Sequence, residues 1–71
     1  MSPAAEVLTA LPIGTRVVVR YRIEGGFTDA LGPLTAIRAD ECVVETKRGA
    51  VTVRLADVVL AKPVPPAPVR R

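Results

Sequence analysis

Few side chains in this sequence of 71 residues could carry out catalysis, since it contains no histidine and a single cysteine. General acid–base catalysis at neutral pH relies on histidine or on carboxylates whose pKa is tuned by close partners. Most of the carboxylates fall in predicted turns or at outward strand positions, where they serve turn formation and solubility; they are Glu24, Asp29, Asp40, Glu41, Glu45 and Asp57. We therefore assign no catalytic residue and predict that the chain itself is not an enzyme.

Cys42 is predicted to be an inert core residue. It lacks a histidine base and precedes Val43 and Val44 in a predicted strand, where a thiol behaves as a small hydrophobic group. One cysteine cannot close an intramolecular disulfide, and without histidine there is no Cys/His cluster to bind structural zinc. We expect no metal and no cofactor in this chain.

Arginines provide the best candidate binding patch. Arg16, Arg20 and Arg22 share the outward face of the first predicted strand, and Arg54 is expected to join them from the fourth. Such a patch could contact the phosphates of a nucleic acid. The alternative is a solvated charged face, because Glu45 is also predicted to point outward and no aromatic side chain interleaves the arginines for base stacking.

The net charge gives little further support to nucleic-acid binding. The formal charge is +3, from ten basic and seven acidic residues. Two of the basic residues are Arg70 and Arg71, so residues 1 to 62 contain eight basic against seven acidic side chains. The folded part is nearly neutral, whereas phosphate binding needs basic groups gathered on one face.

The element pattern is that of an all-β fold. Val17, Val19, Tyr21 and Ile23 alternate with the arginines, so period-two alternation places the four inward. Five strands are predicted, over residues 16–23, 30–37, 42–47, 51–55 and 58–62, with a loop at 24–29, a hairpin turn at 47–50 and a helical turn at 55–58. Gly32-Pro33 should mark an edge, bulge or bend, because proline cannot donate to a strand ladder.

One small barrel accounts for this pattern, since a closed sheet leaves the fewest exposed edges. We place it at residues 11–62, after a flexible N-terminal segment at 1–10 that is frayed or disordered. Residues 63–71 contain four prolines and should form an extended, semi-rigid linker. No apolar run approaches the ~18 residues needed to span a membrane, and the opening residues lack the basic patch of a secretory signal, so we expect a cytoplasmic protein that does not contact membranes.

Four blocks of the chain, spanning most of it, are similar to one known family. They are LPIGTRVVVRYR at 11–22, TDALGPLTAI at 28–37, RGAVTV at 48–53 and ADVVLAKPVPP at 56–66. Together they resemble the Src-homology-3-like domain that precedes the catalytic domain of actinobacterial GNAT-family N-acetyltransferases. The resemblance implies a five-stranded Src-homology-3-like barrel and a linker leading to a transferase domain. The family's acetyl-coenzyme A would bind only in that other domain, because this chain has no Arg/Gln-x-x-Gly-x-Gly/Ala segment.

Three functional hypotheses follow. The first is a non-catalytic accessory module that docks on a catalytic domain of the same protein or on a protein partner. The second is a small nucleic-acid-binding barrel that uses the outward arginines. The third is homo-oligomerisation, through the sheet edge near Gly32-Pro33 or through an apolar outward residue such as Val18.

Overall fold

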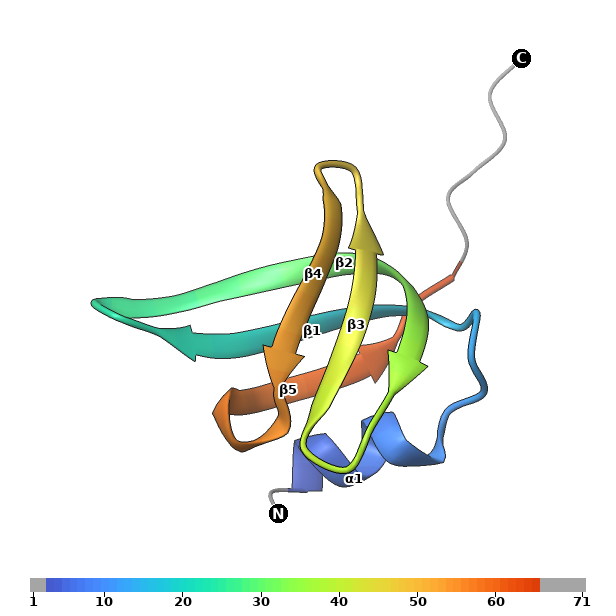
Figure 1. Cartoon of the computed structure of the whole chain (residues 1–71), viewed down its shortest axis with the longest axis horizontal. Coiled ribbons are helices and arrows are strands. Elements are labelled where there is room, and N and C mark those ends of the chain that lie inside the picture. Colours follow the sequence, from blue (N-terminus) through green and yellow to red (C-terminus); the bar gives the residue numbers. More distant parts are fainter. Residues whose placement is uncertain (1–2, 66–71) are drawn as a thin grey trace.

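The alternation of aliphatic and polar residues builds one antiparallel sheet, preceded by a helix. The computed structural model describes residues 3–65. Its elements are α1 (Pro3–Ala10), β1 (Arg16–Ile23), β2 (Gly26–Ile37), β3 (Glu41–Thr46), β4 (Gly49–Arg54), the 3₁₀ helix η1 (Leu55–Asp57) and β5 (Val58–Pro63). The strand order is β4-β3-β2-β1-β5. Figure 1 shows β3 and β4 crossing in front of β1 and β5, with the curved end of β2 joining the two layers.

The predicted fold class is confirmed. Five antiparallel strands form the small barrel, and the helical turn before the last strand is η1. The ends of β3, β4 and β5 differ from the predicted ones by one or two residues. The turn between β3 and β4 is shorter than predicted and consists of Lys47 and Arg48.

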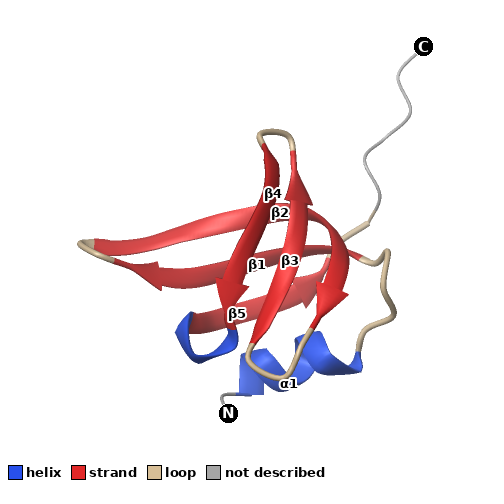
Figure 2. Cartoon of the chain, in the orientation of Figure 1, coloured by secondary structure: helices blue, strands red, loops and turns tan. Residues whose placement is uncertain are grey.

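The predicted loop at residues 24–29 is wrong. Ile23 pairs with Gly26, so the connection is the two-residue turn Glu24-Gly25, and β2 begins directly after it. Gly25 has a φ of 87°, a conformation that glycine adopts without steric cost. The paired glycines therefore tighten a hairpin rather than opening a loop. Figure 2 shows this short turn at the tip of a long hairpin that extends beyond the rest of the sheet.

The prediction that Gly32-Pro33 marks an edge, bulge or bend agrees with a change of pairing partner at this point of β2. β2 pairs with β1 from Gly26 to Pro33 and with β3 only from Leu34 onward. Proline lacks the N–H that a ladder on both edges would need, and the strand exchanges partners directly after Pro33 while continuing to Ile37. This exchange allows the β3–β4 hairpin to cross the layer formed by β1 and β5.

The prediction of a frayed or disordered N-terminal segment is wrong for residues 3–10, which form α1. Ala5 and Leu8, one helical turn apart, are both fully buried, and the helix packs on β5. Proline is compatible with the first helical position, and Glu6 lies in the first turn, where its charge complements the helix dipole. Tertiary burial of the Ala5 and Leu8 face explains why this short segment is helical.

The core is aliphatic, as the alternation predicts. Val17 and Val19 are fully buried, and no polar or charged side chain is buried among the residues that the structure describes. The buried hydrophobic residues of the described chain are Ala5, Leu8, Val17, Val19, Ala30, Leu34, Cys42, Val44, Val53, Leu55 and Val58. The prediction that Ile23 points inward is wrong, because its part of the hairpin extends past the core and leaves it 45% exposed. Tyr21 is half-buried at the core's margin.

Pro63 and Val64, which were predicted to begin the linker, belong to the barrel. Pro63 pairs with Val17, and the backbone N–H of Val64 donates to the carbonyl of Arg16 at 2.9 Å. The rest of the predicted linker, residues 66–71, lies outside the described residues. Within 3–65 no helix is long and apolar enough to cross a membrane.

Candidate functional site

Arg20 is neutralised by a neighbour on the next strand. The β1–β2 register places it opposite Asp29, and its Nε and Nη2 donate to the two carboxylate oxygens at 2.9 and 3.3 Å. This two-pronged geometry is the strong form of an arginine–carboxylate contact. The hydrogen bond from Arg20 lowers the pKa of Asp29, and the same bond raises the pKa of Arg20. Arg20 therefore offers less free charge to a ligand than the sequence suggests.

The ion pair predicts an acid titration. We expect the Asp29 carboxyl to titrate below its ordinary value of 3.8. The pKa of Asp29 is lower in the folded state than in the unfolded state. The ion pair therefore contributes to stability above the unfolded-state pKa, and this contribution is lost as the pH falls through the folded-state pKa. Carboxyl-detected NMR titration of the chain and of Arg20→Gln measures this: the variant's Asp29 should titrate closer to 3.8, and an unchanged midpoint would contradict the assignment.

Arg22 has an aromatic neighbour that sequence reasoning missed. Its guanidinium carbon lies 6.0 Å from the centre of the Phe27 ring, which is 58% exposed. The prediction that no aromatic interleaves the arginines is therefore wrong. It failed because Phe27 was assigned to a loop, whereas in the structure it lies in β2 directly opposite Arg22.

Arg54 lies on a different part of the sheet from Arg16, Arg20 and Arg22, with which it was predicted to form a patch. It ends β4, opposite Glu41 in register, and lines a small hollow with Asp40 and Leu55 beside η1. By contrast, Arg16, Arg20 and Arg22 lie on β1, which is three positions from β4 in the sheet order. Arg54 therefore stands apart from the β1 arginines.

Cys42 is fully buried in the core. Burial raises the pKa of its thiol, and the nearby charge of Glu41 adds to the effect, so the reactive thiolate is disfavoured. Within the described chain, no three His, Cys, Asp or Glu residues gather in a way that could hold a metal ion.

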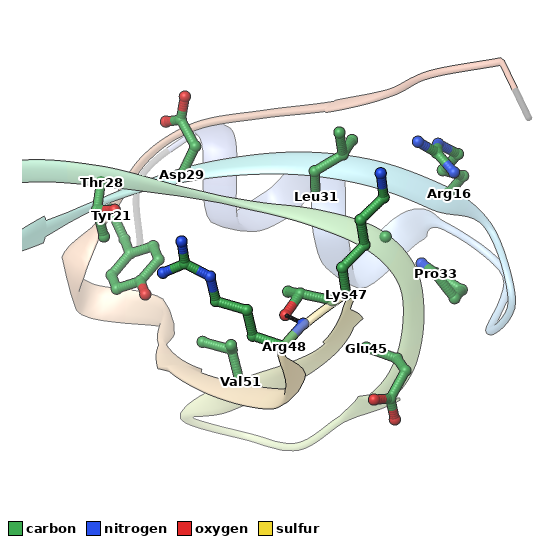
Figure 3. A pocket seen from close by; sticks show the side chains of 12 residues that line it. Arg16, Tyr21, Thr28, Asp29, Leu31, Pro33, Glu45, Lys47, Arg48 and Val51 are labelled. Atoms are coloured by element: carbon green, nitrogen blue, oxygen red, sulfur yellow. Dashed lines mark hydrogen bonds between the residues drawn. The ribbon is translucent and has the colours of Figure 1, made fainter. Parts of the chain in front are cut away.

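A groove lies between β2 and the β3–β4 hairpin, and sequence reasoning did not find it. Its volume is about 750 Å³, within the range of ligand-binding clefts. The lining residues are Arg16, Tyr21, Thr28, Asp29, Leu31, Gly32, Pro33, Glu45, Thr46, Lys47, Arg48 and Val51. In Figure 3 the side chains of Lys47 and Arg48 reach from the hairpin turn toward β2. We call this feature the β2 groove.

The sequence held two signals for the β2 groove. The expected edge, bulge or bend at Gly32-Pro33 and the basic pair Lys47-Arg48 in the hairpin turn were both visible, but neither was assigned to a groove. The groove arises because these two features, distant in sequence, face each other across the gap that the bend opens.

Within residues 3–65, a short helix precedes a five-stranded antiparallel barrel. This arrangement fits the class of small Sm-like domains. Residues 11–62 match the model of one such family, described as the Rv0428c N-terminal Sm-like domain. The match covers most of the chain, so the protein belongs to this family. No significant match was found among curated proteins or among solved structures.

Proposed function

We propose that this barrel is a non-catalytic accessory module that docks on a catalytic domain or protein partner. The observation that carries the proposal is the family match over residues 11–62, to a domain described as N-terminal. The structure supports it in one respect: the described residues have an aliphatic interior, and no three His, Cys, Asp or Glu residues among them gather in a way that could hold a metal ion. An isolated barrel of this kind is better suited to binding than to chemistry.

The finer form of the proposal names the attached domain. The resemblance of the chain to the domain ahead of GNAT-family N-acetyltransferases supports an acetyl-coenzyme-A-dependent transferase as the domain that this barrel serves. Acetyl-coenzyme A would then be bound entirely by that domain. The barrel would act on the transferase's stability, assembly or access to the acetyl acceptor.

The complete coding sequence and one deletion test this. We expect a transferase domain to follow the proline-rich stretch, and removal of residues 1–62 to leave acetyl-coenzyme A binding intact. The deletion should lower the melting temperature of the remaining protein or raise its KM for the acetyl acceptor. A coding sequence that lacks a transferase domain refutes the transferase form, and a deletion that changes neither property refutes the accessory role.

Nucleic-acid binding is a second candidate, favoured by one contact. The exposed Phe27 ring beside Arg22 is the combination on which a single-stranded base stacks. Binding of a short single-stranded RNA should then weaken steeply with salt, and Phe27→Ala should reduce it more than Val59→Ala, an exposed control on β5. A flat salt response would remove this candidate.

Homo-oligomerisation through Val18 or the edge near Gly32-Pro33 stays a prediction, which sedimentation at two concentrations would address.

A further inference from the structure

The first half of β2 has a free backbone edge. β2 lies between β1 and β3 in the sheet, but its residues from Gly26 to Pro33 pair with β1 alone, and pairing with β3 starts at Leu34. Among the described strands, none completes the second edge of this segment. An open edge presents unpaired N–H and C=O groups that can accept a further strand.

The β2 groove runs along this open edge. Successive residues of a strand point to opposite faces, yet both Thr28 and Asp29 line the groove, as do Leu31 and Gly32. A hollow lined by both faces of a strand meets the strand along its edge rather than over one face. The opposite wall is the β3–β4 hairpin, which contributes Lys47, Arg48 and Val51 among others (Figure 3).

The charge of the groove is positive. Arg16, Lys47 and Arg48 line it, and the ion pairs found within residues 3–65 involve none of them. Two acidic residues, Asp29 and Glu45, also line the groove. Asp29 is already paired with Arg20, so of the two only Glu45 is outside the ion pairs found within residues 3–65. A ligand that brings carboxylates would therefore be complementary to the groove.

We propose that the β2 groove binds an extended acidic peptide segment, which adds as a strand to the open edge of β2 and places its carboxylates against Lys47 and Arg48. This inference rests on the proposed function, because it takes the barrel to be a protein-interaction module. It adds the docking surface and the chemistry of the partner. Strand addition draws affinity from backbone hydrogen bonds and specificity from alternate side chains.

The same features argue against other occupants. Nucleic acids lack the backbone amides that pair with an open strand edge. The chain's own residues 63–71 contain four prolines and no acidic residue, so this segment offers few ladder donors and the wrong charge. A second copy of the chain is an outcome of the test.

The test is an NMR titration of the ¹⁵N-labelled chain with a seven-residue peptide that alternates valine and glutamate and is blocked at both ends. We expect amide shifts at Thr28–Leu31 and at Lys47 and Arg48, at peptide concentrations up to millimolar. Arg48→Glu should weaken binding about tenfold or more. The matched control Lys62→Glu, an exposed charge on β5 outside the groove, should bind as the unaltered chain does.

Two further peptides separate the backbone and charge contributions. A peptide with N-methyl groups on its central amides cannot form the ladder, and one with lysine in place of glutamate is repelled, so both should fail to bind. The proposal is overturned if either binds as well as the parent peptide, if the parent produces no shifts, or if the shifts fall elsewhere. It is also overturned if the same shifts appear on concentrating the chain alone, because the occupant is then a second copy.

The two proposals fail separately. If the peptide does not bind but deletion of the barrel still impairs the attached enzyme, docking is real and uses another surface. If the peptide binds as expected but the deletion has no effect, the groove is a peptide site and the accessory role is wrong.

Discussion

Leu8→Ala should destabilise the barrel by about 3 kcal/mol, within the usual range for truncating a buried leucine. Leu8 is 0% exposed and is among the largest fully buried side chains of the core. The substitution removes apolar atoms and leaves a cavity between α1 and the sheet, which cannot collapse fully. A domain of this size has a total stability of roughly 5 kcal/mol, so the variant should lose most of it. Urea denaturation followed by circular dichroism measures the difference.

Val7→Ala is the matched control, on the same helix but 37% exposed. It should change stability by no more than about 0.5 kcal/mol, as surface substitutions usually do. A destabilisation by Leu8→Ala no larger than that of Val7→Ala would mean that α1 does not close the core. Deletion of residues 1–10 gives a second measurement: it should abolish the cooperative transition, because the sheet face beneath α1 would be exposed.

The helix illustrates what the sequence could not predict. An isolated eight-residue helix is unstable in water, so local propensity alone favours the frayed segment that we predicted for residues 1–10. What makes the segment helical is the uncovered apolar surface of strands that follow much later in the chain. The centre of β1 was predictable, because the alternation around Val17 and Val19 directly specifies which face of the strand is buried, whereas the start of β2 at Gly26 was not predicted.

The candidate site was predictable only in part, because the contacts of its residues depend on how separate strands pair. Alternation alone placed Arg16, Arg20 and Arg22 on one face of β1. Their neighbours depend on the β1–β2 register, which a two-residue turn at Glu24-Gly25 fixes and a longer loop would shift. The misassigned loop therefore concealed both the Asp29 ion pair and the Phe27 contact.

Gly32→Ala is the second substitution with a large expected effect, about 3 kcal/mol. A Cβ at this position would overlap the backbone carbonyl oxygen of Glu45 on β3 and lie 2.9 Å from its carbonyl carbon. Backbone atoms cannot turn aside as a flexible side chain can, so the two strands must separate, and such overpacking costs up to about 3 kcal/mol. The residue's positive φ of 157° is also one that side-chain-bearing residues rarely adopt, which adds strain. Chemical denaturation should show the loss.

Gly14→Ala distinguishes the close approach from the backbone conformation. Gly14 also has a positive φ, 97°, but a Cβ there meets nothing within 4 Å, so its substitution should cost only the conformational strain of about 1 kcal/mol. Equal losses from the two variants would mean that β2 and β3 do not approach closely at Gly32. A larger loss at Gly32 would locate the tightest constraint of the barrel where β2 changes partners, the point from which the β3–β4 hairpin diverges and the β2 groove opens.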